Sequence, residues 1–345
     1  MELSYRPFLL EYKHPFGVSG HTRTQTQSVF TKIVWEGFVG YGEACLPPYL
    51  GETLEATTSF LEKAKPFLKK QSYPCSIIEI LMELDEMDER CNAAKASIDI
   101  ALNDLKGKIE NRTVRELYRL NATENLYTSC TIGLDTEEKL KKKIEEAKDF
   151  HILKIKAGTE DDKKLVETVR KYSDKPLYVD VNRGWKEKNK ALELAQWFKE
   201  QNVVLIEQPF PIEQLDDSAW LTERSPLPII ADESIKRLSD IKKIKGAFSG
   251  INIKLMKCTG LSEAFQMIEL CKAFDLKIFL GCMAESSCGT SAMAQFISCA
   301  DYIDLDAPSL LKNDPFMGIT YLAGKIILND QPGIGVTNSI FLEAV

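Results

Sequence analysis

The stretch Val203-Val204-Leu205-Ile206-Glu207 is a short apolar run that ends in one charged residue, and four more runs end in the same way. The five terminal charges follow one another at intervals of 24, 27, 25 and 22 residues, about one strand, loop and helix each. Parallel strands of a barrel present their carboxyl ends on one face, so we expect the five charges to converge. The other runs are Ile152-Leu153-Lys154-Ile155-Lys156, Pro176-Leu177-Tyr178-Val179-Asp180, Pro228-Ile229-Ile230-Ala231-Asp232 and Gly250-Ile251-Asn252-Ile253-Lys254.

The alternation of strand and helix patterns extends beyond these runs. Eight strand-like segments with helical spacing between them are the number that a closed parallel barrel requires. We therefore predict an α/β protein with a capping domain at 1–122, a parallel (β/α) barrel at 123–317, and a C-terminal segment at 318–345 that returns to the capping domain. The strand centres lie near Cys130, Lys154, Val179, Leu205, Ile230, Ile253, Phe279 and Ile303.

The block before the barrel has its own pattern. Residues 28–35 and 38–43 read as strands on either side of a turn at Glu36-Gly37. Helical spacing follows over 52–70 and 76–108. The capping domain is therefore expected to be α+β.

Composition and charge exclude several classes of protein. A chain of 345 residues with 44% hydrophobic and 28% charged residues has room for a barrel and a smaller domain. Its formal net charge of -7 argues against nucleic acid or an anionic membrane surface as a partner. We expect no membrane helix, because no apolar run approaches the roughly 18 residues that such a helix needs, and no signal peptide, because residues 1–14 lack a basic stretch followed by an apolar one. The nine cysteines are scattered and read as reduced thiols, so we expect a cytoplasmic protein.

Three of the five terminal charges are the carboxylates of Asp180, Glu207 and Asp232, on successive predicted strands. Oxygen ligands in this number, with room left for a substrate group, suit Mg²⁺. For any one of these acids, a solvated or lysine-paired position at the barrel mouth is the alternative. Three successive strand ends favour a metal site.

The other two terminal charges are Lys156 and Lys254, one on either side of the acids in strand order. Burial and a nearby cation can bring a lysine into the range of a working base, so both are base candidates, with a salt bridge as the alternative. Lys154 shares a face with Lys156 and could neutralise a substrate carboxylate, or serve as a structural lysine. Glu233 and Lys257 border the site and are expected to hold Lys254 or the metal ligands.

The last predicted strand ends in Asp304-Leu305-Asp306. Carboxylates two residues apart on a strand point to the same side, so this pair could hold a positively charged group of a substrate. A solvated strand end is the alternative. Cys282 and Met283 on the seventh strand are expected to line the pocket, and Thr131 on the first strand is a further wall candidate.

These motifs together resemble the enolase superfamily, muconate-lactonizing subgroup, over essentially the whole chain. The resemblance implies one Mg²⁺ per subunit and a lysine base for proton transfer. The motifs are specific for the superfamily but only weakly specific for the reaction, because enzymes of the subgroup that catalyse different reactions share them. The motifs are Lys154-Ile155-Lys156, Asp180-Val181-Asn182, Glu207-Gln208-Pro209, Asp232-Glu233-Ser234 and Lys254-Leu255-Met256-Lys257.

Within the subgroup, the pair Asp304 and Asp306 is similar to the dipeptide epimerases, where it receives the free α-ammonium of the substrate. The resemblance therefore implies an isomerase that inverts Cα of the second residue of an L-Ala-Xaa dipeptide, by 1,1-proton transfer through a metal-stabilised enediolate. It implies a small-molecule dipeptide partner, and we expect a homo-oligomer. The alternatives are an o-succinylbenzoate synthase or an N-acylamino-acid racemase, whose substrates lack the ammonium, and a non-catalytic barrel used for binding.

The second residue of the substrate stays open. An Ala-Glu epimerase of this family can have an arginine in the loop after the first strand. By spacing from Phe16, His21 falls at that position and Arg23 lies two residues further on. Both are substrate-binding candidates, and either glutamate or a small or hydrophobic side chain fits this departure.

Overall fold

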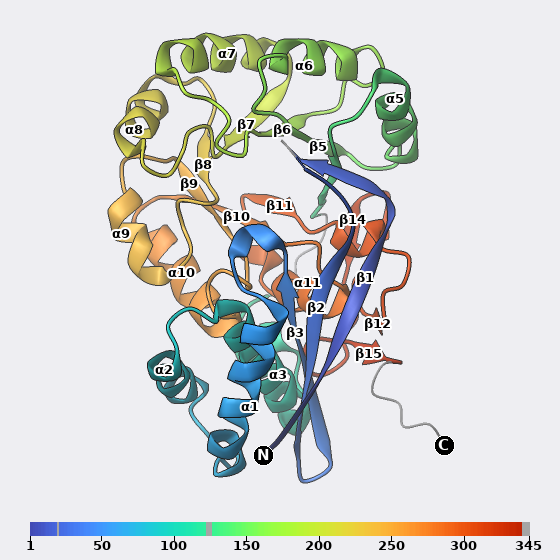
Figure 1. The fold of residues 1–345 in the computed structure, drawn as a ribbon, viewed down its shortest axis with the longest axis vertical. Coiled ribbons are helices and arrows are strands. Elements are labelled where there is room, and N and C mark those ends of the chain that lie inside the picture. The colour runs from blue at the N-terminus through green and yellow to red at the C-terminus, as the bar shows by residue number, and fades with distance from the viewer. Residues whose placement is uncertain (19–20, 122–125, 340–345) are drawn as a thin grey trace.

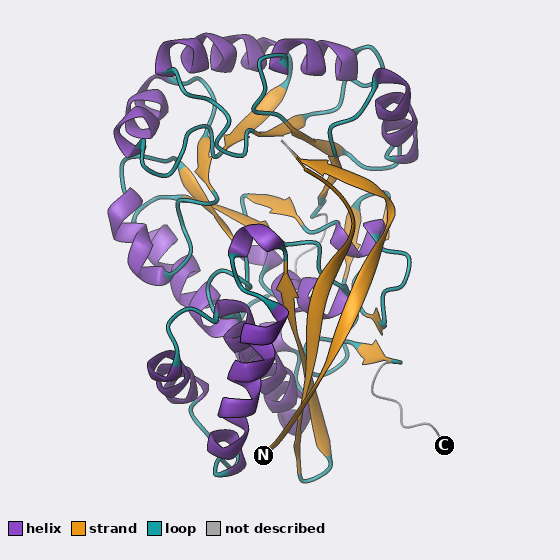
Figure 2. Cartoon of the chain, viewed as in Figure 1, coloured by secondary structure: helices purple, strands orange, loops and turns teal. Residues whose placement is uncertain are grey.

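The structure is a computed structural model, and it describes residues 1–18, 21–121 and 126–339. It contains a three-stranded antiparallel sheet with its own helices and an eight-stranded parallel sheet that curves into a barrel (Figure 1). Figure 2 shows the helices of the barrel outside its strands. The predicted α/β barrel with an α+β capping unit is confirmed, whereas the boundaries 1–122, 123–317 and 318–345 stay predictions. Elements β1 to α4 are called the cap below.

The cap begins with three strands that pair in the order of the chain. Glu36 and Gly37 form the turn between the second and third strands, with φ of 47° and 83°, as the sequence predicts. The strands are β1 (Glu2–Val18), β2 (His21–Trp35) and β3 (Phe38–Leu46).

The helical stretch predicted over 76–108 is two helices in the structure. Asp88 has extended backbone at the end of the first one, and its side chain accepts a hydrogen bond from the backbone N of Arg90 at 2.9 Å. This local bond competes with continued helix and explains the break. The cap helices are α1 (Leu54–Lys69), α2 (Ile77–Met87), α3 (Asn92–Glu110) and α4 (Val114–Leu117).

Helix α3 lies directly on β3 because two glycines of the strand leave room for it. A Cβ atom at Gly40 would lie 2.0 Å from the carbonyl oxygen of Ala101, and one at Gly42 would lie 1.9 Å from that of Ser97. Larger residues at either position would push the helix away. The close contact makes the sheet and α3 one packed body.

The barrel has eight parallel strands, each hydrogen-bonded to the next in chain order. They coincide with the eight predicted strand centres. The bounds are β4 (Ser129–Ile132), β5 (Ile152–Lys156), β6 (Leu177–Asp180), β7 (Val203–Glu207), β8 (Ile229–Ala231), β9 (Gly250–Ile253), β10 (Lys277–Gly281) and β11 (Tyr302–Asp304).

Helices connect these strands around the outside of the barrel. The sequence pattern does not predict α11, because all eight of its residues are buried and no polar face marks a period. None of the helices in the described ranges combines the length and hydropathy of a membrane span. The helices are α5 (Glu137–Glu146), α6 (Asp162–Arg170), α7 (Lys188–Glu200), α8 (Leu215–Arg224), α9 (Ile241–Ile244), α10 (Leu261–Ala273) and α11 (Ser287–Ala294).

The barrel closes between β11 and β4 through side chains. The described strands form no ladder there, but the backbone N of Leu305 donates to Oγ1 of Thr128 at 2.8 Å. Oγ of Ser129 donates to Asp304 Oδ1 at 2.7 Å, and the backbone N of Thr131 donates to Asp306 Oδ2 at 2.6 Å. The two predicted substrate-binding carboxylates therefore also hold the seam of the barrel.

The C-terminal segment runs back to the cap. The backbone N of Ile334 donates to Asp104 Oδ1 of α3 at 2.9 Å, and that of Gly333 donates to the carbonyl of Arg112 at 2.9 Å. Strand β12 (Phe316–Met317) directly precedes this segment, which contains β13 (Thr320–Leu322), β14 (Lys325–Ile327) and β15 (Thr337–Asn338).

Candidate active site

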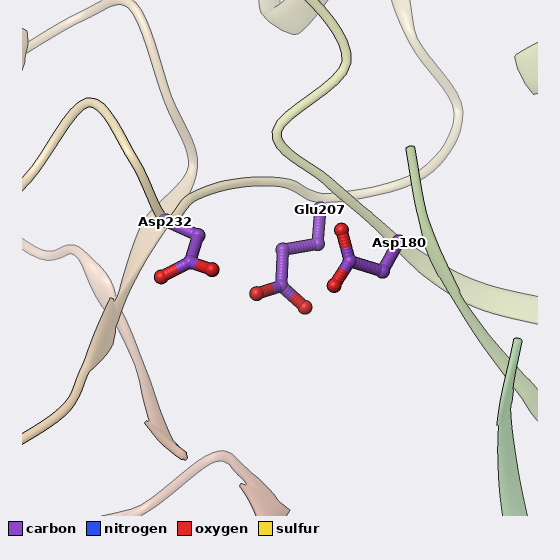
Figure 3. Close-up of side chains that lie close together, drawn as sticks. All are labelled: Asp180, Glu207 and Asp232. Carbon is purple, nitrogen blue, oxygen red and sulfur yellow. The ribbon is translucent and has the colours of Figure 1, made fainter. Parts of the chain in front are cut away.

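Three carboxylates meet at the carboxyl ends of neighbouring barrel strands (Figure 3). Asp180 and Glu207 are the last residues of β6 and β7 and stand opposite each other in the register, and Asp232 follows β8 directly. One oxygen from each lies within 4.8 Å of the others, and all three side chains are buried. The predicted convergence of the acids is what the structure shows.

Lys156 and Lys254 contact this acid cluster from two sides. Lys156 Nζ lies 2.6 Å from Asp180 Oδ2, and Lys254 Nζ lies 2.7 Å from Asp232 Oδ2. Burial opposes ionisation of Asp232, but the charges of Lys254 and Lys257 outweigh it and hold the pKa of this carboxyl well below its usual value. Each base candidate therefore touches one end of the cluster.

Lys154 is buried among three carboxylates. Its Nζ lies 2.7 Å from Glu207 Oε2, 2.8 Å from Asp304 Oδ2 and 3.4 Å from Asp180 Oδ2. Burial alone would lower the pKa of Lys154, but the three negative charges raise it well above the usual value. This side chain is a fixed cation between the acid cluster and the last strand.

Glu207 has the least favourable environment of the three acids for a negative charge. Burial and then the charge of Asp180 raise the pKa of Glu207 to about 7, although Asn252 Nδ2 donates to its Oε1 at 2.8 Å. Burial is the larger cause, and the neighbouring carboxylates add to it. Three hard oxygen donors that lie close together fit a divalent cation such as Mg²⁺.

The two residues predicted to border the site differ in what they contact. Lys257 Nζ donates to Asp232 Oδ1 at 2.5 Å and to the carbonyl oxygens of Asp232 and Asn252, so it fixes a candidate ligand. Glu233 lies at the cavity wall in an ion pair with Arg183 at 3.2 Å. Burial and the charge of Asp232 raise the pKa of Glu233 to about 7.

Asp304 and Asp306 both line the cavity, but not as alternate residues of one strand. Strand β11 ends at Asp304, and Asp306 has helical backbone at the start of a short 3₁₀ turn, Ala307–Leu310. The backbone leaves the strand conformation there because Pro308 stands in the first positions of the 3₁₀ turn that follows Asp306. This turn and the seam contacts place both carboxylates at the cavity. The prediction that the two acids point to one side because they alternate along a single strand is therefore wrong.

The cavity beside Asp232 has a volume of 260 Å³, and residues of both the cap and the barrel line it. The predicted wall residues Thr131, Cys282 and Met283 line it, and so does Arg23 of β2. The side chain of His21 lies outside the described residues. Lining residues that the sequence did not suggest are Tyr12, Pro47, Tyr49, Asn182, Arg183, Ala307 and Leu310.

Two supporting contacts escaped sequence reasoning for different reasons. Asn252, which donates to Glu207, precedes Lys254 by two residues and could have been found from the two-residue period of a strand. Tyr49 donates to Met283 Sδ at 2.6 Å across the boundary between cap and barrel. A contact of this kind depends on how the two parts dock, which no local pattern encodes.

The comparisons with known proteins agree with this architecture. Residues 7–118 match the mandelate racemase / muconate lactonizing enzyme N-terminal domain, and residues 135–339 match the enolase C-terminal domain-like family. The chain therefore belongs to the mandelate racemase and muconate lactonizing enzyme group of the enolase superfamily.

Its relatives narrow the class further. The chain is 46% identical to an L-Ala-D/L-Glu epimerase of Bacteroides thetaiotaomicron, over 97% of this chain and 88% of the relative. A substrate-liganded L-Ala-D/L-Glu epimerase from Bacillus subtilis has a TM-score of 0.91 and 27% identity, covering 98% and 99% of the two chains. A dipeptide epimerase from Enterococcus faecalis complexed with Mg and L-Leu-L-Tyr has a TM-score of 0.90 and 30% identity, with the same coverage. The predicted family and isomerase class are confirmed.

The contacts of Lys154 predict a large cost for its removal. Lys154→Met leaves buried carboxylates without their counter-charge, which typically costs about 3–5 kcal/mol. We expect the free energy of unfolding of the metal-free protein, measured by urea denaturation, to fall by that amount. The control Lys171→Met breaks an ion pair with Glu137 whose side chains are 56% and 50% exposed, and should cost less than about 1 kcal/mol. Equal losses in both variants would contradict the prediction.

Proposed function

We propose that the protein is a Mg²⁺-dependent dipeptide epimerase that inverts Cα of the second residue of L-Ala-Xaa dipeptides. The observation that carries the proposal is the acid cluster between two lysines, Lys156 from β5 and Lys254 after β9. The epimerase relatives, one of them complexed with Mg and a dipeptide, support the same reading.

Asp180, Glu207 and Asp232 would hold one Mg²⁺ per subunit. When bound, the metal supplies positive charge for the substrate carboxylate and for the negative charge that develops on it. Lys154 adds a second, permanent cation beside the cluster. This preorganised charge is the main electrostatic contribution of the protein to the reaction.

Two lysines on opposite faces of the substrate perform the proton transfer. One neutral lysine amine takes the α-proton: the C–H bond breaks, an N–H bond forms, and the electron pair of the C–H bond spreads onto the carboxylate. The other lysine, as an ammonium, gives a proton to the opposite face of Cα, which inverts the centre. Lys156 and Lys254 exchange these roles when the reaction runs in reverse.

Removing either lysine tests the two-base mechanism. Lys156→Ala and Lys254→Ala should each abolish epimerisation of L-Ala-L-Glu in the presence of Mg²⁺, because one face loses its proton donor or acceptor. Each variant should still exchange the α-proton of a single substrate epimer with ²H₂O. Proton NMR and chiral chromatography measure the two processes. Epimerisation that survives in both directions in either variant would rule the mechanism out.

The surroundings of the Asp306 carboxyl favour a free dipeptide over an N-acyl amino acid as the substrate. Asp304 is already neutralised by Lys154 at 2.8 Å, whereas the ion pairs of the described residues do not include Asp306. Burial and the charge of Asp304 raise the pKa of Asp306 to about 7. A substrate ammonium beside Asp306 would supply the cation that this buried carboxyl lacks.

Asp306→Asn removes that charge and keeps the shape. A buried charged hydrogen bond is typically worth about 2–5 kcal/mol, so kcat/KM for free L-Ala-L-Glu should fall by roughly 30-fold to several thousand-fold. N-acetyl-L-Ala-L-Glu has no ammonium and should lose much less. Damage to folding affects both substrates and cancels in the comparison. Equal losses would move the assignment to the acylamino-acid racemases or synthases.

The second residue of the substrate is proposed to be glutamate. Arg23 lines the cavity with its guanidinium 5.7 Å from the ring centre of Tyr49, and the ion pairs of the described residues do not include Arg23. Arg183, the other arginine of the cavity, is engaged by Glu233. Arg23 therefore offers its charge to a substrate carboxylate, in agreement with the L-Ala-D/L-Glu epimerase relative.

Neutralising Arg23 should change specificity and not general activity. Loss of a hydrogen bond to a charged group costs about 1.5–3 kcal/mol, so Arg23→Met should lower kcat/KM for L-Ala-L-Glu by about 10- to 150-fold. L-Ala-L-Gln, which has the same shape without the charge, should be nearly unaffected. Arg183→Met is the matched control and should not discriminate between the substrates. An equal effect of Arg23→Met on both substrates would exclude the glutamate assignment.

A further inference from the structure

The loop that carries Lys254 is a tight coil between β9 and α10. The backbone N atoms of Lys257 and Cys258 donate to the carbonyl of Lys254 at 2.9 and 3.3 Å, and the N of Gly260 donates to the carbonyl of Leu255 at 3.1 Å. A displacement of one end of this coil is therefore transmitted to Lys254 at the other end.

Cap helix α3 bonds to this coil and to the first turn of α10, which follows the coil directly. Asn92 Nδ2, at the start of α3, donates to the carbonyl of Lys257 at 2.9 Å. Seven residues on, Asp99 accepts from the backbone N of Ser262 at 3.1 Å and from its Oγ at 2.5 Å. Gly260 has φ of 114°, and a Cβ there would lie 2.3 Å from Asp99 Oδ2, so the carboxylate presses directly on the coil. These contacts tie the coil to the cap.

Two further cap elements are linked to the same coil or to the helix that follows it. The backbone N of Cys45, on β3, donates to Met256 Sδ at 3.3 Å. Asp85, on α2, pairs with Arg237 at 2.6 Å, and Arg237 in turn pairs with Glu263 of α10 at 2.8 Å. The cap thus contacts the Lys254 coil from β3 and α3, and it is linked to the first turn of α10 from α2 through Arg237.

The loop after Lys156 is held in another way. Asp162, the first residue of α6, accepts from the backbone N atoms of Gly158 and Thr159 at 3.1 and 2.9 Å. Trp185 Nε1 donates to the same carboxylate at 2.8 Å. In the part of the chain that the structure describes, the side-chain hydrogen bonds found for this loop come from barrel residues. The loop after Lys254 is thus held by the cap as well as by the barrel, whereas in the described residues the side-chain hydrogen bonds of the loop after Lys156 come from the barrel.

We propose that Asn92 and Asp99 are positioning residues through which the cap sets the place of Lys254 but not that of Lys156. The two faces of proton transfer are then controlled by different parts of the protein. This inference rests on the proposed function, because it concerns its two bases. Misplacing a catalytic group by about 1 Å can cost about 100-fold in rate, so a loosened coil should impair one face selectively.

The test measures each face separately. Wild-type protein, Asn92→Ala and Asp99→Asn are incubated with Mg²⁺ in ²H₂O, with L-Ala-L-Glu or L-Ala-D-Glu, and α-deuterium uptake before inversion is followed by NMR. Lys254→Ala identifies the epimer whose proton Lys254 removes. Uptake by that epimer should fall by about 10- to 100-fold in both positioning variants, and uptake by the other by less than about twofold. The matched control Asp162→Asn should show the opposite preference.

A structural readout accompanies the kinetic one. Backbone amide exchange, followed by mass spectrometry on the metal-free protein, should rise over residues 254–262 in Asn92→Ala and stay unchanged over 157–162. Asn92 is partly exposed and loses one hydrogen bond, so this variant carries the test if Asp99→Asn does not fold. Equal slowing of both epimers, or unchanged uptake by both, would overturn the inference. If wild-type protein exchanges neither epimer, the proposed function fails instead, and unchanged amide exchange over 254–262 would overturn the positioning claim as well.

Discussion

Pairing of buried charge at the barrel mouth is the constraint on which the rest of the site depends. A carboxylate removed from water is tolerated only when a cation or several donors face it, and breaking one such pair leaves an uncompensated charge. The strand ends satisfy this condition by placing lysines on both sides of three successive acids. The carboxylates are Asp180, Glu207, Asp232 and Asp304, and the lysines are Lys154, Lys156, Lys254 and Lys257.

The arrangement also explains why the same side chains can serve stability and chemistry. Lys156 and Lys254 each pair with one oxygen of a candidate ligand, so a divalent cation bound at the cluster would share these carboxylates with them. Lys257 remains on the other oxygen of Asp232 and keeps that carboxylate oriented. The acid cluster is thus preorganised by lysines before any ligand arrives, which limits the reorganisation that catalysis requires.

The parts of the fold that local pattern encodes could be predicted from the sequence. Strand ends in a parallel barrel meet on one face, so the spacing of the charges along the chain was sufficient to predict that Asp180, Glu207 and Asp232 lie together. The turn at Glu36-Gly37 was equally local. The break between α2 and α3 was not predicted, because a single side-chain bond of Asp88 overrides a continuous helical period.

Contacts that arise from docking could not be predicted in the same way. Asp99 and Tyr49 act across the boundary between cap and barrel, at sequence separations where no period relates them to their partners. Asp306 lines the cavity because a 3₁₀ turn begins there, and not because it alternates with Asp304 along one strand. Residue type and spacing identify which groups meet at a barrel face, but the supporting contacts depend on the packing of one unit against the other.

In the proposed function, the residues that close the seam between β4 and β11 are also those that would bind the substrate. Because the described strands form no ladder there, Ser129 and the backbone of Thr131 bond to the carboxylates of Asp304 and Asp306 instead. Asp304 pairs with the Lys154 cation, whereas the ion pairs found among residues 1–18, 21–121 and 126–339 do not include Asp306, which accepts from the backbone N of Thr131. Under the proposed function, a substrate ammonium would balance the charge of Asp306. Substrate recognition at this end would then follow from the way the barrel is closed.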